Sequence, residues 1–427
     1  MSVDPTPAPA FESAPTRVGL AVDLLRRLAR LAASLVVALP LWPAYALLAR
    51  ERPPHVPSTA RCWRVLRRAL SEPMAELHPS VRWQIVLTIV ERWLQIPLAA
   101  FAWWLDERLH GRALDAVRVV EPLIELSAAR SGSTQLAHYV EDDPEVCAPS
   151  TVGVGFPYLW LWRLASATVG RLVTLDDANA AFMRRLPPAF LERHEFDLRR
   201  TDSFEIVFMH HHLGDLTWYL GPACYAEEHG PVEQTEANRE YWQDLVRFLD
   251  RVGRKTLLRS GCARLMVKGH FLAVADDLER LYPDARFLTV LRRPDKRVES
   301  TIAHHRWQPA EPGFPPAPWA WLVERDVPLE IAYCEAEMAW FQREGGARRC
   351  VIRFDDYVRD LEGTMARVYR ECLDREELPA HVPRVHAPRR RRGYSEERSL
   401  ADLGIDVGGI ERRLAAYYRW CGAQVEG

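Results

Sequence analysis

The pattern of hydrophobic positions divides the chain into two unlike regions. From about residue 116 onward, short apolar runs alternate with segments in which apolar residues recur every three or four positions. Strands separated by helices at this spacing predict an α/β fold with a parallel sheet and helical crossovers. The runs expected to form strands are Val119-Val120 with Ile124-Leu126, Ile206-Met209, Leu265-Val267, Phe287-Leu291 and Cys350-Phe354.

The first 115 residues have a different pattern. Residues 1–16 are rich in Pro, Ala, Ser and Thr and are predicted to be a disordered tail. In the helical region that follows, residues 17–115, the uncharged run Leu31-Ala49 contains two prolines, and the apolar stretch Trp83-Leu105 carries four tryptophans. Two interpretations of this region stay open: contact with a membrane interface, or helices of the core or of an oligomer interface. The prolines disfavour a full span.

Composition narrows the function classes. A hydrophobic content of 48% with 27% charged residues is typical of a folded protein. The net charge of −2, with no basic block that contains interleaved aromatics, argues against nucleic-acid binding. The eight cysteines form no CxxC pair, which disfavours both a zinc site and a disulfide scaffold and suits a reducing compartment.

A candidate anion site follows the strand that ends near Leu126. The loop Ala129-Arg130-Ser131-Gly132-Ser133-Thr134 leads directly into a helical pattern. Gly132 allows a backbone conformation closed to other residues. Ser131, Ser133 and Thr134 supply three hydroxyls, and the free amides at the start of the helix favour an anion. Arg130 adds a fixed charge with several donors. The loop lacks the Gly-Lys-Ser/Thr of nucleotide triphosphatases, and no strand ends in a clear magnesium-binding Asp, so no metal is expected.

A second strand, Phe287-Leu291, runs into Arg292-Arg293-Pro294, with Ser300 eight residues after Arg292. Pro294 is suited to the first turn of a helix. Taken in this order, the two segments resemble the PAPS-dependent sulfotransferase family in its bacterial form (PAPS is 3′-phosphoadenosine 5′-phosphosulfate). The resemblance implies a P-loop-like parallel sheet flanked by helices. It also implies that residues 130–134 hold the 5′-phosphosulfate and that Arg292 and Ser300 hold the 3′-phosphate.

A third segment, Lys268-Gly269-His270, is similar to the Lys-Thr-His stretch of cytosolic members, with Gly269 in place of Thr. By resemblance, Lys268 contacts the transferred sulfuryl group and His270 is the general base. Bacterial branches often use a carboxylate instead, and Glu205 is the leading candidate. The neighbouring triplet His210-His211-His212 is a poor metal site, because side chains on an expected strand alternate in direction.

The last part of the chain extends the resemblance, which covers residues 116–427. The basic stretch 388–394 is similar to the closing segment of bacterial members, where such residues help to hold the 3′-phosphate, and Arg391 is the candidate. The departure from the cytosolic Arg-Lys-Gly-x-x-Gly pattern leaves open which arginine reaches the ligand.

The sequence therefore predicts a sulfotransferase that moves a sulfuryl group from PAPS to a hydroxyl or amine and releases adenosine 3′,5′-bisphosphate. The expected acceptor is a small molecule, a lipid or a glycan, and the tryptophan-rich N-terminal region favours a hydrophobic one. Two alternatives stay open: a P-loop-type nucleotide kinase, and a membrane-associated binding protein on a sulfotransferase fold. PAPS supply favours a cytoplasmic catalytic domain, peripheral or monotopic at a membrane. The oligomeric state is not predicted.

Overall fold

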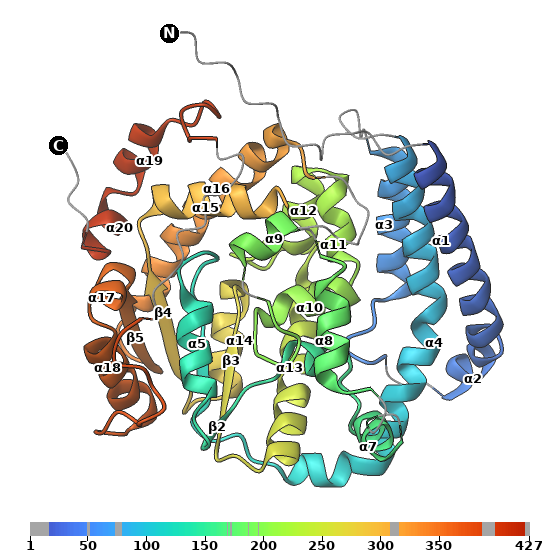
Figure 1. Ribbon diagram of the computed structural model, residues 1–427, viewed down its shortest axis with the longest axis horizontal. Coiled ribbons are helices and arrows are strands. Elements are labelled where there is room, and N and C mark those ends of the chain that lie inside the picture. The colour runs from blue at the N-terminus through green and yellow to red at the C-terminus, as the bar shows by residue number, and fades with distance from the viewer. Residues whose placement is uncertain are drawn as a thin grey trace.

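The computed structural model describes residues 17–48, 52–72, 79–168, 170, 173–186, 188–194, 196–307, 316–386 and 398–422. Its centre is a five-stranded parallel sheet in the order β2-β3-β1-β4-β5 (Figure 1). The strands are β1 (Leu123–Glu125), β2 (Val146–Cys147), β3 (Arg264–Lys268), β4 (Arg286–Leu291) and β5 (Arg348–Arg353). The predicted α/β fold with a parallel sheet is confirmed.

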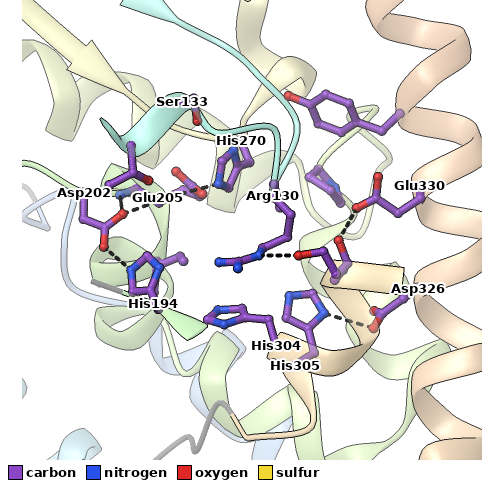
Figure 2. Close-up of a pocket in the computed structure, with 18 of the residues that line it drawn as sticks. Arg130, Ser133, His194, Asp202, Glu205, His270, His304, His305, Asp326 and Glu330 are labelled. Carbon is purple, nitrogen blue, oxygen red and sulfur yellow. Dashed lines mark hydrogen bonds and ion pairs between the residues drawn. The ribbon is translucent and has the colours of Figure 1, made fainter. Parts of the chain in front are cut away.

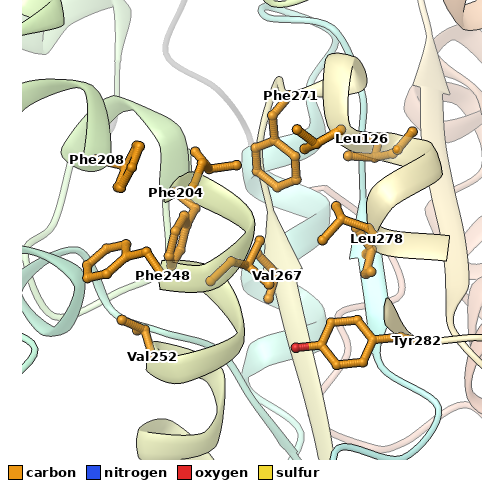
Figure 3. Close-up of a cluster of buried hydrophobic side chains, with 14 of the residues drawn as sticks. Leu126, Phe204, Phe208, Phe248, Val252, Val267, Phe271, Leu278 and Tyr282 are labelled. Atoms are coloured by element: carbon orange, nitrogen blue, oxygen red, sulfur yellow. The ribbon is translucent and has the colours of Figure 1, made fainter. Parts of the chain in front are cut away.

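The sheet is buried on both faces, because helices connect its parallel strands and cover each side. Within β1, Leu123 packs into the core under α5 and α18, and Ile124 packs into the opposite core under α13, α14 and α16. These helices are α5 (Ser133–Glu141), α13 (Arg239–Ser260), α14 (Ala275–Leu281), α16 (Trp319–Phe341) and α18 (Leu361–Leu373). Figure 3 shows the second core, where Val267 of β3 appears between Phe248 of α13 and Leu278 of α14.

Shorter helices form the connections and the upper rim in Figure 1. They are α6 (Thr151–Gly155), α7 (Leu159–Ala167), α8 (Leu175–Met183), α9 (Pro188–Arg193), α10 (Phe204–His211), α11 (Gly214–Thr217), α12 (Pro222–His229), α15 (Pro294–His305), α17 (Phe354–Arg359), α19 (Val407–Arg413) and α20 (Ala415–Trp420). Pro294 opens α15, as its fixed φ and missing N–H favour. The strand ends that point to this rim carry the candidate site.

The N-terminal helices are part of the body of the protein. They are α1 (Arg17–Ala38), α2 (Leu41–Leu48), α3 (Thr59–Ser71) and α4 (Pro79–Ala116). Val65 of α3 and Ile89 of α4 share a buried cluster with Leu216 of α11. The uncharged run from Leu31 is not one helix, because a turn at Leu39-Pro40 separates α1 from α2. The expected disordered tail, residues 1–16, lies outside the described residues.

In the part of the chain that the structure describes, α4 is the one helix long and apolar enough to cross a membrane by length and composition. It contains the apolar stretch predicted from the sequence. Only 39% of the apolar 18-residue segment of this helix is buried inside the protein, so much of the helix faces outward.

Three strand assignments differ from prediction. Ile206-Met209 lies in helix α10, where Phe204 and Phe208, four residues apart, point together into the core. A short apolar run fits a buried helix as well as a strand, and here tertiary packing selects the helix. Val119 and Val120 lie outside the sheet, and the two-residue strand β2 was too short to be recognised.

Candidate active site

The loop between β1 and α5 has the backbone that the sequence predicted. Gly132 has a φ of 92° and directly precedes α5. A Cβ on this residue would lie 2.8 Å from the ring of Phe354, so both the conformation and the space require glycine. Arg130 also has a positive φ of 62°, a strained value for an arginine. The resulting turn places the N-terminal amides of α5 at the end of the central strand, a suitable cradle for an anion.

The two predicted nucleotide segments meet at Arg130. Its Nε donates a hydrogen bond to Ser300 Oγ over 3.1 Å. Arg292 Nη1 donates to the backbone carbonyl of Arg130 over 2.6 Å, and its guanidinium stacks on Phe354 with 4.6 Å to the ring centroid. The strand β4 and the helix α15 thus bring two guanidinium groups and a hydroxyl to the same cradle.

These groups line one cavity of about 1090 Å³ (Figure 2). Eight of the predicted residues line it: Arg130, Gly132, Ser133, Thr134, Glu205, His270, Arg292 and Ser300. Two others do not. Ser131 and Lys268 are fully buried behind the wall, and Ser131 Oγ finds no hydrogen-bond partner among the described residues. The predicted Arg391 lies outside the described residues.

His270 is held as a neutral base by two hydrogen bonds. Its Nδ1 lies 2.6 Å from the carbonyl oxygen of Ser127, which can only accept, so Nδ1 carries the proton. Its Nε2 then accepts from Ser203 Oγ at 3.0 Å. Burial, with the nearby charge of Lys268, lowers the pKa of His270 to about 3.

Lys268 acts on His270 through the same serine. Its Nζ donates to Ser203 Oγ over 2.9 Å, so the hydroxyl accepts from the lysine and donates to the histidine. Asp202 Oδ1 lies 3.6 Å from that ammonium group, and Asp202 Oδ2 lies 2.6 Å from His194 Nε2. Burial acts to raise the pKa of Asp202, but His194 and Lys268 together lower it. No local pattern marks Ser203, because its role as a shared partner depends on Lys268 and His270, which lie 65 and 67 residues away in the chain.

Glu205 points into the cavity beside His270 (Figure 2). Burial raises the pKa of this carboxyl to about 7, against the opposing charge of Lys268. Its Oε2 has no hydrogen-bond partner among the described residues. Gly269 makes room for it, because a Cβ there would collide with Glu205 Oε2 and with the ring of Phe271. The glycine that departs from Lys-Thr-His therefore accommodates a buried carboxylate.

Several lining residues were missed by the sequence reasoning. His194 and His304 lie with their ring centroids 5.3 Å apart next to Arg130. Burial, followed by the charge of Arg130, lowers the pKa of His304 well below its usual range. Arg398 lines the cavity from the segment after the predicted basic stretch, with its guanidinium 5.5 Å from the ring centroid of Trp319. Basic composition suggested this region but could not select the residue.

Part of the cavity wall is aromatic and apolar. Trp218, Tyr225, Tyr241, Trp242 and Met209 line this part. They come from helices α10, α12 and α13 and from the 3-10 helix Trp218–Leu220. The cavity therefore combines the cationic groups at the end of the sheet with an aromatic surface on the helices, where Asp326 and Glu330 also line it.

The site suits an anionic ligand such as a phosphate group. Gly132 shapes the turn before α5, and the guanidinium groups of Arg130 and Arg292 adjoin this turn with the Ser300 hydroxyl. Among the described residues no cluster of three or more His, Cys, Asp or Glu side chains is arranged to hold a metal ion. Together, the fold and the site define a parallel α/β protein of the P-loop-like class with a cradle suited to an anion at the carboxyl end of its central strand.

Comparison with known proteins is consistent with that class. A model of the sulfotransferase family, described as "Sulfotransferase family", matches residues 122–374, more than half of the chain. The protein belongs to the sulfotransferase family. No curated protein matches.

Two solved structures share the fold. The crystal structure of sulfotransferase STF9 from Mycobacterium avium superposes with a TM-score of 0.60 at 17% identity, over 87% of this chain and 94% of that one. Sulfotransferase STF1 from Mycobacterium tuberculosis H37Rv gives a TM-score of 0.57 at 17% identity, over 84% and 92%. The first match covers more of the chain than residues 116–427 account for, so the shared fold includes part of the N-terminal helices.

Proposed function

We propose that this protein transfers the sulfuryl group of PAPS to a hydroxyl or amine on a hydrophobic acceptor. The observation that carries the proposal is the junction of Arg130, Ser300 and Arg292 beside the N-terminus of α5. It joins the segment expected to hold the 5′-phosphosulfate to the segment expected to hold the 3′-phosphate. Arg398, which lines the same cavity, is the C-terminal arginine among the described residues that is suited to the nucleotide, and Arg391 stays a prediction.

Glu205 is the general base in this proposal. It takes the proton of the acceptor as the acceptor oxygen or nitrogen forms a bond to sulfur, while the bond from sulfur to the phosphate oxygen breaks. His270 is less suited, because Nδ1 is committed to Ser127 O and the lone pair on Nε2 already accepts from Ser203. Glu205 lines the cavity, its Oε2 is buried beside Gly269 without a side-chain partner among the described residues, and its pKa is raised to about 7.

Arg130 stabilises the leaving group. Its guanidinium keeps a fixed positive charge, and the amides at the start of α5 add oriented dipoles. Charge that gathers on the departing phosphate oxygen is thereby neutralised without a metal ion. Lys268 would not touch the sulfuryl group in this arrangement, because Ser203 separates it from the cavity.

The acceptor is proposed to be hydrophobic, carrying one hydroxyl or amine at its reacting end. The aromatic wall formed by Trp218, Tyr225 and Tyr241 favours a ring system or an acyl chain over a charged glycan. An apolar group placed there would have its reacting atom near Glu205, which lines the same cavity.

Calorimetric titration of the purified protein with adenosine 3′,5′-bisphosphate and with ATP tests the nucleotide assignment. We expect the bisphosphate to bind at least tenfold more tightly, because the cradle lacks the lysine and the metal ligands that a triphosphate needs. Arg292→Ala should abolish this preference, and Arg293→Ala should keep it, because Arg293 is paired with Asp295 and does not line the cavity. Tighter binding of ATP would favour the kinase alternative instead.

Sulfur-35-labelled PAPS, incubated with separate lipid and soluble extracts, tests the acceptor. Label recovered in organic-soluble products is the expected result. Label confined to water-soluble products would contradict the hydrophobic acceptor while leaving the sulfotransferase assignment in place. Binding of the bisphosphate with no turnover in either extract would favour the non-catalytic alternative.

A further inference from the structure

The second half of α4 presents an exposed apolar face. Leu98, Phe101 and Leu109 are 44%, 43% and 57% exposed, and Trp104, 45% exposed, borders them. Leu98, Phe101 and Trp104 follow one another at three-residue spacing, and Leu109 lies about three turns after Leu98, so the four share one side of the helix. The rings of Phe101 and Trp104 stack with their centroids 5.7 Å apart, which forms a continuous aromatic surface. Soluble proteins seldom leave such a patch uncovered without a reason.

The charge on this face is positive. Arg108 and Arg112 lie on the same side of α4 and are exposed, and neither has an ion pair or hydrogen bond with any described residue. The acidic residues of the same stretch are already neutralised. Arg251 pairs with Glu107 at 2.9 Å and with Asp115 at 2.8 Å, and Lys255 pairs with Asp106 at 2.7 Å. The exposed face of α4 therefore consists of an apolar area bordered by the guanidinium groups of Arg108 and Arg112.

Two neighbouring helices also carry exposed apolar side chains. On α1, which packs against α4, Leu25, Leu28 and Val36 are exposed at 65%, 44% and 77%. On α7, which packs against α4 near Ala102, Leu164 is 51% exposed. Arg163 next to it is exposed and has no partner among the described residues. Figure 1 shows α1, α2 and α4 along one outer side of the molecule, away from the sheet.

We propose that this face of α4, from Leu98 to Arg112, docks on an anionic lipid bilayer and lies in its interface. Apolar side chains would enter the boundary between headgroups and acyl chains, with the arginines on the phosphates. The helix cannot cross the bilayer, because its opposite side is committed to the protein: Ile96, Ala100 and Trp103 are buried there, and Asp106 forms a buried ion pair with Lys255. The proposal is independent of the reaction assigned to the cavity.

Flotation of the full-length protein with vesicles is the direct test. We expect it to float with vesicles that contain phosphatidylglycerol, to float weakly with pure phosphatidylcholine, and to lose binding as salt is raised. Phe101→Ser with Trp104→Ser should weaken partitioning at least tenfold. Arg108→Ala and Arg112→Ala should each weaken it about fivefold, on anionic vesicles only.

The matched controls are Val358→Ser and Arg370→Ala, which alter an exposed valine on α17 and an exposed arginine on α18. Both should float like the parent protein. Three results would overturn the proposal: no flotation of a folded protein, equal loss in the control variants, or equal binding to neutral and anionic vesicles. A concentration-dependent dimer that Phe101→Ser disrupts would assign the face to a second copy of the chain and would also overturn it.

Discussion

Ser203 Oγ lies 3.0 Å from His270 Nε2 and 2.9 Å from Lys268 Nζ, so one hydroxyl joins the two residues that the family resemblance would place on the substrate. The chain from lysine to serine to histidine satisfies all three polar groups in a buried position. It also uses the lone pair with which His270 would accept a proton. Glu205, which lines the same cavity, is then the carboxylate suited to take the proton in the proposed reaction.

Ser203→Ala should destabilise the fold by about 1–3 kcal/mol, because it leaves a buried ammonium and a buried imidazole without their shared partner. Denaturant unfolding followed by circular dichroism measures the change. Ser260→Ala, which removes an exposed hydroxyl bonded to Thr256 O, is the matched control and should change stability by less than about 0.5 kcal/mol. Equal stability of both variants would show that the bridge contributes nothing.

The pH profile distinguishes the two candidate bases. A base must be deprotonated to act, so activity is lost as the pH falls through its pKa. With Glu205 as base, kcat/KM should fall below about pH 7, where its carboxyl becomes protonated. With His270 as base the fall would come near pH 3. Glu205→Gln should lower kcat by about 10²–10⁴-fold and remove the limb near pH 7. If the fall of kcat/KM near pH 7 persists in Glu205→Gln, a group other than Glu205 causes it.

Gly132→Ala should weaken binding of adenosine 3′,5′-bisphosphate by at least tenfold. The substitution forces a positive φ on alanine, at about 1–2 kcal/mol, and pushes a methyl group against the Phe354 ring. Gly404→Ala separates the two effects, because Gly404 also has a positive φ, of 70°, but nothing within 4 Å of its Cβ. Calorimetric affinities and unfolding curves of both variants provide the comparison. The prediction is wrong if both variants bind equally well.

Arg130 and Ser300 should act as a coupled pair. Arg130→Ala and Ser300→Ala each remove the bond between them, so the double variant should lose less affinity than the product of the single losses. A coupling of about 0.5–3 kcal/mol is expected for groups in direct contact. Titration with the bisphosphate across the four proteins measures it, and strict additivity would show that the hydrogen bond has no role in the ligand site.

Gly269→Thr, which restores the Lys-Thr-His pattern of the cytosolic relatives, should inactivate this protein. The added side chain would collide with Glu205 and with Phe271, so the carboxylate must leave its position. Turnover of PAPS and the unfolding free energy should both fall. Gly111→Ala is the tolerated control, because its Cβ would meet only ordinary contacts with Glu107 and Arg251. An active Gly269→Thr variant would argue against Glu205 as the base.

The sequence correctly predicted the elements whose conformation depends on residues close together in the chain. The strand, the glycine at positive φ and the helix start lie within residues 123–134, so their pattern alone predicted the anion cradle. Pro294 likewise marked the start of α15. The apolar run that begins at Ile206 was wrongly predicted to be a strand. Only the packing of Phe204 and Phe208 in the core distinguishes a short helix from a strand there.

Continuous stretches of sequence predicted the fold class, the family and the two segments expected to hold phosphate. The sequence did not show which side chains meet in space. The folded chain places Ser203 between Lys268 and His270, sets Lys268 behind the cavity wall and turns Glu205 into the cavity. Burial, desolvation and hydrogen-bond pairing depend on elements distant in the chain, and those factors set the pKa and the direction of each candidate catalytic group.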